Sequence, residues 1–496
     1  MTKPTFSNRR AAGLVFLVAV AVYLNSLAGE FVFDDTSVIQ SNPQIRSLGW
    51  TNLTQIFGSH YWQTVAGQGG LYRPVVILSY ALNYAAGGLD PWGYHLVNVV
   101  LHALAAVLVY AVIEELFREA RFSLWSGLLF ALHPIRTEAV AYLTGRAEIL
   151  AALFFLAAWR CHLLGRWALG AGAFLLAALS KESAFTLPAV LLLGDWAGRR
   201  RFDPPRYAPF VAMAVAALGL RYLVLGGLTP LAITPSANPV AAAPTPVRLM
   251  TATEVAGRYL GLLILPVGLS ADYSYNQIPP VSSPRQWSFV ISLAALAAVA
   301  AGTVWAGRRG ARALVLCGSF FFATFSLTSN FLRPIGTIMA ERLMYLPSLG
   351  FTCACAWLVS RARQPGLAVA GGVLLAGLWG ARTVARNADW REHLSLFSSA
   401  AVTSPDSSLV RANLAHALLR KGDASGAAEQ AREAIRIEPG DPAAHMTLAH
   451  AYQSLGDWSR AVEAYARVEQ LAPGTAGGQE AARRRQALLR RLGGPG

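Results

Sequence analysis

Charged side chains are scarce in this sequence. They make up 14% of its 496 residues, whereas hydrophobic side chains make up 54%. A soluble domain carries about 25% charged residues, so roughly half of the expected charge is missing. Several apolar runs approach or exceed the ~20 residues that cross a bilayer, and the first two are 11–28 and 97–116. The scarcity of charge excludes an ordinary soluble protein and predicts a polytopic membrane protein.

Cysteine is also rare, and its positions exclude two roles. Cys161, Cys317, Cys353 and Cys355 all lie within or beside apolar runs, which argues against a disulfide framework. Cys353 and Cys355 do not make a zinc site by themselves, because a closed site takes four ligands.

Acidic residues are outnumbered by basic ones, 27 against 42, which gives a net charge of +15. In a soluble protein such an excess would suggest nucleic acid as a partner. In a membrane protein it indicates orientation, because Lys and Arg collect in cytoplasmic loops. The first apolar run follows Arg9 and Arg10 and has no small-residue cleavage site, so it is predicted to be a retained anchor. The predicted partner is a lipid bilayer, with no nucleic acid.

Eleven apolar runs are separated by gaps, and alternate gaps carry clusters of basic residues. The runs lie near 11–28, 97–117, 122–143, 147–165, 167–180, 183–197, 206–226, 286–307, 313–330, 340–360 and 366–385. One more segment, 247–268, carries Arg248, Glu254 and Arg258. A crossing there would move the later basic clusters to the outer side, so an amphipathic or re-entrant helix is predicted. The result is about eleven transmembrane helices, with a cytoplasmic amino end and an outer carboxyl end.

The carboxyl-terminal part has an internal repeat. The sequence from Leu414 realigns 34 residues later from Leu448, and Gly422 then matches Gly456. This period, with small residues where helices cross, is typical of tetratricopeptide repeats (TPRs). The prediction is an all-α membrane domain at 1–386, then a short soluble TPR solenoid at 387–475. The solenoid comprises a half repeat at 387–405 and repeats at 406–439 and 440–473, and a basic helical tail follows at 476–496.

Two adjacent carboxylates, Asp34 and Asp35, stand just beyond the first apolar run. They open a predicted outer loop at 29–96, which shares its side of the membrane with the segment 227–287 and with the repeats. A partly desolvated carboxylate is a stronger base, and it could take a proton from an attacking hydroxyl group. Alternatively, one carboxylate caps a helix and the other is solvated. The sequence leaves both alternatives open, and also which Asp would be the base.

Further ionisable residues fall at the same predicted boundary. They are Arg73, His95, His133, Glu138, Arg146, Glu148, Lys181, Glu182, Glu341 and Arg342. Charged groups at membrane depth are costly, so they mark a functional site or pair with one another. Arg146, Lys181 and Arg342 are predicted to hold a phosphate group, and the others to support them. A divalent metal could assist, but no ligand set in the sequence calls for one.

Several of these segments together resemble a known family. FVFDDTSVIQSN, LYRPVVILSYALNY, HLVNVVLH, HPIRTEAVAYLTGRAEIL, LSADYSYNQIP and AERLMYLPSLGF occur in this order. They resemble the TMTC family of transmembrane and tetratricopeptide-repeat O-mannosyltransferases and its bacterial relatives.

The resemblance implies a GT-C-like glycosyltransferase that takes a sugar, with mannose expected, from a polyprenyl-phosphate carrier. Asp34 and Asp35 would match the family's acidic motif, one of them acting as general base, and Arg342 and Arg146 would hold the lipid phosphate. The repeats would bind a protein acceptor or partner. Composition favours a bacterial inner-membrane protein with periplasmic repeats, or lumenal repeats in the endoplasmic reticulum of a eukaryote.

Two other functions remain open from the sequence. A non-catalytic membrane scaffold could use the repeats to assemble an envelope complex, and a lipid or sugar transporter could use the polar turns. The sequence fixes neither the sugar nor the acceptor.

Overall fold

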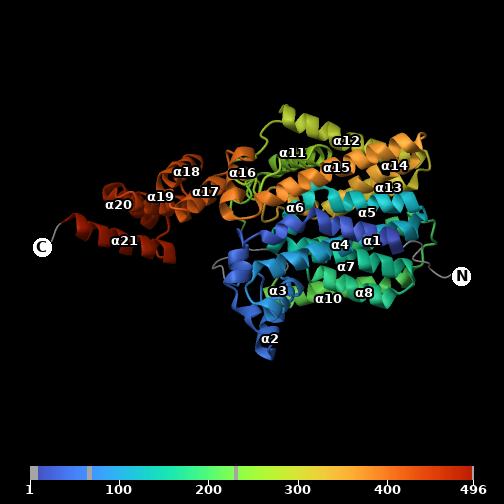
Figure 1. Ribbon diagram of the computed structural model, residues 1–496, viewed down its shortest axis with the longest axis horizontal. Helices are drawn as coiled ribbons and strands as arrows, with labels where there is room; N and C mark the ends of the chain where they lie inside the picture. The colour runs from blue at the N-terminus through green and yellow to red at the C-terminus, as the bar shows by residue number, and fades with distance from the viewer. Residues whose placement is uncertain (1–8, 64–69, 228–232, 494–496) are drawn as a thin grey trace.

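The computed structural model describes residues 9–63, 70–227 and 233–493, in which every regular element is a helix (Figure 1). Small parts of the predicted membrane domain, outer segments and tail lie outside these residues, namely 1–8, 64–69, 228–232 and 494–496. Each of the eleven apolar runs overlaps one α-helix of at least eleven residues. These are α1 (Arg9–Val22), α4 (Pro91–Phe117), α5 (Ala120–Leu132), α7 (Arg146–Leu163), α8 (Trp167–Ala178), α9 (Leu187–Ala197), α10 (Ala208–Leu225), α12 (Trp287–Arg308), α13 (Arg312–Phe325), α14 (Ser348–Arg361) and α15 (Pro365–Asp389).

Five helical segments among the described residues are long and apolar enough to cross a membrane by themselves. They are Arg9–Ala28, Pro91–Phe117, Pro204–Leu225, Trp287–Arg308 and Pro365–Asp389. A sixth span is possible if the bent pair Pro134–Ala141 and Leu143–Leu163 counts as one. The total of eleven crossings stays a prediction.

The run 122–143 does not form a single helix. Helix α5 ends at Leu132, because Pro134 lacks the N–H group that would continue it. A short helix, α6 (Thr137–Ala141), follows. The connection between α5 and α7, residues 133–145, is called the hairpin here. The chain bends by 103° between Pro134–Ala141 and Leu143–Leu163, which includes α7. The bend places the polar residues of the hairpin at one end of the bundle instead of along a crossing.

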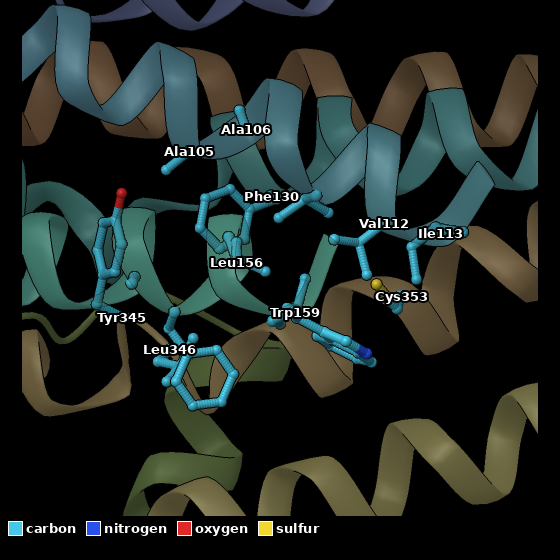
Figure 2. Packing of buried hydrophobic residues seen from close by; sticks show 14 of the residues in the cluster. Ala105, Ala106, Val112, Ile113, Phe130, Leu156, Trp159, Tyr345, Leu346 and Cys353 are labelled. Atoms are coloured by element: carbon cyan, nitrogen blue, oxygen red, sulfur yellow. The ribbon is translucent and has the colours of Figure 1, made fainter. Parts of the chain in front are cut away.

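The core of the membrane domain lies between α4, α5, α7 and α14. Figure 2 shows Phe130 of α5, Leu156 and Trp159 of α7, and Tyr345 just before α14 packed together. These side chains are buried. They hold the helices so that the turns at one end stay close to one another.

Polar contacts join the first and last long helices. Asn387 donates its side-chain N–H to the backbone oxygen of Val22 (2.9 Å) and to Oδ1 of Asn25 (2.8 Å). Asn25 donates in turn to the backbone oxygen of Val384 (2.8 Å). The end of the bundle where α1 and α15 finish is called the array end here, because the repeats begin beside it (Figure 1).

The two predicted outer segments contain helices of their own. The first includes α2 (Trp50–Gly58) and α3 (Pro74–Gly87), and the second leads into α11 (Thr245–Ile264). Helix α11 is not among the described helices that could cross alone. It packs against α12 and buries Val255, Tyr259 and Leu263 in a cluster with Phe321 and Phe325 at the carboxyl end of α13. Its position relative to a membrane stays a prediction.

Helix pairs form at the predicted repeats. Helix α16 (His393–Thr403) is followed by α17 (Ser408–Arg420) with α18 (Ala424–Ile437), then α19 (Pro442–Ser454) with α20 (Trp458–Leu471), and finally α21 (Ala476–Leu492). The recurring Gly-Asp pair makes each turn. Gly422 and Gly456 adopt positive φ angles of 88° and 77°, which glycine tolerates, and Asp423 and Asp457 cap the next helix.

The array is attached to the membrane domain through the segment that precedes α12. Ser407, at the start of α17, donates to Oδ2 of Asp272 (2.9 Å), and the hydroxyls of Ser404 and Ser270 lie 2.8 Å apart. An apolar cluster lies beside these contacts. It includes Val32, Ala141, Tyr142, Ala271, Trp390, Leu396, Phe397, Ala400, Ala401, Val410 and Leu414. The half repeat therefore packs on the membrane domain, close to the loop that carries Asp34 and Asp35.

Candidate active site

The acidic loop, residues 29–42, lies at the array end. It follows the last turn of the first helix and reaches Phe33, whose φ of 53° is left-handed. This conformation is uncommon for a residue with a Cβ atom, and it turns the chain just before Asp34. The backbone N–H of Asp34 donates to the hydroxyl of Tyr142 (3.2 Å). The loop is thus set against the hairpin that links α5 and α7.

Asp35 holds this loop in place. Its side chain is fully buried, and its two oxygens accept hydrogen bonds from the backbone N–H groups of Val32 (3.0 Å) and Thr144 (2.9 Å). Burial raises the pKa of this carboxyl group to about 8, although the N–H donors oppose the rise. Asp35 therefore ties the loop to the hairpin and has little room for a substrate.

Asp34 is the less buried of the two residues, with an intermediate exposure, whereas Asp35 is buried. Burial is the largest influence and raises its pKa. The Tyr142 hydroxyl and the positive charge of Arg342 lower the pKa, whereas the negative charge of Asp272 raises it further. The outcome is a carboxyl group of increased basicity on a residue that is not fully buried.

Arg342 stands beside Asp34 in a pair with Glu138. Its backbone N–H donates to Oε2 of Glu138 (2.8 Å), and its guanidinium group forms an ion pair with Oε1. Glu138 is completely buried, whereas the side chain of Arg342 is 25% exposed. The guanidinium carbon lies 6.0 Å from the ring centre of Tyr142. Glu138 thus fixes an arginine that still presents surface for an anion.

Three more ion pairs lie near the start of α7 and α9. Lys181 forms an ion pair with Glu148. Glu182 accepts from Arg73 (2.7 Å) and from Arg221 of α10 (2.7 Å). These two arginines lower the pKa of Glu182 to about 2 despite its burial. Lys181 therefore has a carboxylate partner already, and the predicted supporting residues Arg73, Glu148 and Glu182 form structural pairs.

Arg146 is placed differently from its predicted role. It is fully buried, and its nitrogen atoms donate to Oδ1 of Asn98 (2.7 Å), Oδ1 of Asn83 (2.6 Å) and the backbone oxygen of Tyr94 (2.9 Å). Its guanidinium also lies over the ring of Tyr80 at 4.7 Å. Neutral groups of α3 and α4 occupy the donors, so this geometry argues against a phosphate contact at Arg146.

The remaining predicted residues serve packing and loop placement. The Nδ1 of His133 accepts from the backbone N–H of Ile135 (3.2 Å) just after α5, and its Nε2 lies 2.9 Å from the backbone oxygen of Leu263. His95 is buried against Gly29, where a Cβ atom would come within 2.8 Å of its Nε2. Glu341 accepts from the hydroxyl of Tyr273 (2.8 Å) and so anchors the segment at 269–278. The structure brings Asp34, Arg342 and Glu138 together and leaves both histidines outside that group.

Three residues near the site were not singled out from the sequence. Tyr142 lies in the recognised motif HPIRTEAVAYLTGRAEIL, but its neighbours are apolar, so the sequence does not indicate a polar role for its hydroxyl group. Asp272 lies far along the chain, in a stretch (259–284) that has no other charged residue. The sequence signal that could have identified Arg221 is its position as an arginine within the apolar run 206–226. Across the described parts of the chain, no group of three or more His, Cys, Asp or Glu side chains is placed to hold a metal ion.

Two segments match known protein families. Residues 227–300 match the family described as Protein O-mannosyl-transferase TMTC, DUF1736. Residues 418–483 match a tetratricopeptide repeat family. The first match covers the segment that attaches the array, and the second confirms the repeats that the 34-residue period predicts.

Curated proteins are similar over most of the chain. Human Protein O-mannosyl-transferase TMTC3 is 27% identical over 96% of this chain, and Tmtc3 of Drosophila melanogaster is 26% identical over 92%. Protein O-mannosyl-transferase F38B6.6 of Caenorhabditis elegans is 29% identical over 86%. The alignments cover only 57%, 58% and 63% of those relatives, respectively. These matches confirm the resemblance to the TMTC family, and with the apolar helices they identify a multi-pass membrane protein.

Among solved structures, ArnT from Cupriavidus metallidurans bound to undecaprenyl phosphate aligns with 92% of this chain and 80% of its own. The TM-score is 0.42 and the sequence identity is 16%.

Proposed function

From its relationship to the TMTC proteins, we propose that this chain is an inverting membrane glycosyltransferase of GT-C-like architecture. It transfers a sugar, with mannose expected, from a polyprenyl-phosphate carrier to a hydroxyl group of a protein. The array end faces the periplasm, or the lumen of the endoplasmic reticulum in a eukaryote. The observation that carries the proposal is the carboxylate of the incompletely buried Asp34 beside the accessible guanidinium of Arg342.

Asp34 acts as the general base. The acceptor hydroxyl gives its proton to this carboxylate while its oxygen attacks the anomeric carbon from the face opposite the carrier. A new carbon–oxygen bond forms, the bond from the anomeric carbon to the phosphate oxygen breaks, and the configuration inverts. The proton then passes from Asp34 to solvent.

Arg342 stabilises the departing phosphate. A guanidinium fork is suited to phosphate oxygens, and Glu138 holds it in position from the buried side. A phosphate monoester leaves as an anion without protonation, so the site has no need of the second acidic carboxyl group that a glycosidase uses. Lys181 contributes charge near the carrier but stays paired with Glu148.

The proposal is tested by sugar transfer with purified protein in lipid. Radiolabelled polyprenyl-phosphate mannose is the donor, and a membrane-protein extract provides acceptors. The expected result is labelled protein that depends on Asp34 and Arg342. Failure of the wild type both to bind donor and to transfer sugar would favour a scaffold. Donor binding without transfer would reject the sugar or the acceptor, and carrier movement across vesicles without transfer would favour a transporter.

The pH dependence of transfer gives a further prediction. Transfer requires ionised Asp34, so the rate rises with pH through the pKa of this group. Asp272 raises that pKa through its negative charge, and Asp272→Asn removes the charge. The pH of half-maximal kcat/KM is therefore expected to fall by about half a unit, the size expected for like charges across a solvated surface.

The control for this experiment is Ser407→Ala. It removes the hydrogen bond from Ser407 to Asp272 but keeps the negative charge of Asp272. The pH of half-maximal kcat/KM on the acid side of the profile, the acid limb, is therefore expected to stay at its wild-type value. A midpoint that moves upward in Asp272→Asn, or does not move, would contradict the assignment of the acid limb to Asp34.

A further inference from the structure

The half repeat contacts the acidic loop through one side-chain and one backbone hydrogen bond, and the side-chain bond involves His393. His393 is the first residue of α16. Its Nε2 accepts from the backbone N–H of Phe33 at 3.2 Å, across a separation of 360 residues. Phe33 directly precedes Asp34, so the bond fixes the peptide group between Val32 and Phe33, one residue before the proposed base.

Phe33 needs support from its surroundings. Its φ of 53° is disfavoured for any residue that carries a Cβ atom. Its ring is held on two sides, stacked on Tyr142 at 6.0 Å and edge-on to Phe397 of α16 at 5.7 Å. His393 and Phe397 are one helical turn apart and act on the backbone and the ring of the same residue. Helix α16 therefore supplies two of the contacts that hold this conformation.

Helix α16 is also tied to the array behind it. It packs against α17, and Lys421 at the end of α17 forms an ion pair with Glu392, the residue before His393 (2.7 Å). The backbone oxygen of Arg391 accepts from the N–H of Glu30 in the acidic loop (2.8 Å). A movement of α17 would thus reach the loop through residues 391–397.

We propose that His393 is a positioning residue of the glycosyltransferase site. It fixes the backbone of Phe33 and so aims the carboxylate of Asp34, which makes the first helix of the TPR array a part of the catalytic machinery. The inference rests on the proposed function for its kinetic consequence, but the placement of the loop can be measured without it.

The chemistry of the contact dictates the variants. Neutral imidazole accepts through the unprotonated Nε2, and half-burial of His393 keeps its pKa below the usual histidine value. The amide oxygen of glutamine occupies about the place of Nε2 and can accept the same hydrogen bond. Phenylalanine keeps the ring but has no acceptor. His393→Gln is therefore the conservative variant and His393→Phe the disruptive one.

The test compares both variants with the wild type in the transfer assay and in amide hydrogen exchange. His393→Phe is expected to lower kcat at least tenfold and to leave the KM for the lipid-linked donor within twofold, while His393→Gln restores most of kcat. Exchange in the peptide 29–42 is expected to speed up in His393→Phe alone. His450→Phe makes the same change on α19 and is expected to alter neither readout.

Two results would overturn the inference. One is wild-type kcat in His393→Phe with unchanged exchange of the peptide 29–42. The other is equal loss of kcat in His393→Gln and His393→Phe, which would indicate a packing role. If the wild type transfers no sugar, the proposed function fails on its own terms. The exchange rates then decide the positioning role, and faster exchange in His393→Phe alone supports it.

Discussion

Asp34→Asn is expected to abolish sugar transfer almost completely while leaving the donor bound. Asparagine keeps the size of the side chain but cannot take a proton from the acceptor hydroxyl. General-base catalysis contributes about 10²–10⁴-fold to a rate, and kcat is expected to fall by that factor. Single-turnover transfer measures kcat, and binding of radiolabelled donor to protein in lipid measures the retained affinity.

Two further variants make the result specific. Asp90→Asn changes an exposed aspartate that caps α4; asparagine caps a helix equally well, so wild-type transfer is expected. Asp35→Asn changes the carboxylate that accepts from Val32 and Thr144. It is expected to lower thermal stability as well as transfer, because the loop loses an anchor. If Asp34→Asn keeps more than a tenth of the wild-type kcat, Asp34 is not the base.

Arg342→Met is expected to lower both stability and transfer, for two separable reasons. Glu138 is completely buried, and removal of one partner of a buried ion pair costs about 3–5 kcal/mol. The lost hydrogen bonds to the carrier phosphate are each worth about 1.5–3 kcal/mol, which corresponds to about tenfold to 100-fold weaker donor binding. Thermal unfolding in detergent measures the first effect, and donor binding in lipid measures the second.

The double variant Glu138→Gln with Arg342→Met separates the two effects. Glutamine removes the unpaired buried charge, so most of the thermal stability is expected to return. Donor binding is expected to remain weak, because the guanidinium group is still missing. Recovery of donor binding together with stability would show that Arg342 serves only to neutralise Glu138, and the phosphate would then need another partner.

The helices and the repeats could be predicted because their signals are local. Apolar runs mark the membrane helices, and the 34-residue period marks the helix pairs from α17 to α20. The end of α5 was also predictable, because Pro134 cannot donate the hydrogen bond that continues a helix. The length of the helix in 122–143 could not be predicted. The apolar composition continues past Pro134, but the chain bends there, and polar contacts of the hairpin stabilise the bend.

The roles of the charged residues could not be read in the same way, because their partners come from distant segments. Arg146 and Arg342 look alike in the sequence, each within a motif at the same boundary. Only the fold shows that Asn83 and Asn98 surround Arg146, whereas Arg342 keeps exposed surface. Likewise, the sequence could not choose between Asp34 and Asp35, since the choice depends on Thr144, which lies 109 residues away from Asp35.

The hydrogen bonds between the two ends of the membrane domain also set an order in time. Asn25 and Phe33 find partners at Val384 and His393, which are 359 and 360 residues later. During synthesis from the amino end these partners emerge at least 359 residues after Asn25 and Phe33, and contacts of such long sequence separation form late. The acidic loop therefore acquires its shape only when the array begins to appear. Until then the nascent chain carries Asp34, the proposed base, without the loop geometry that the proposed transfer requires.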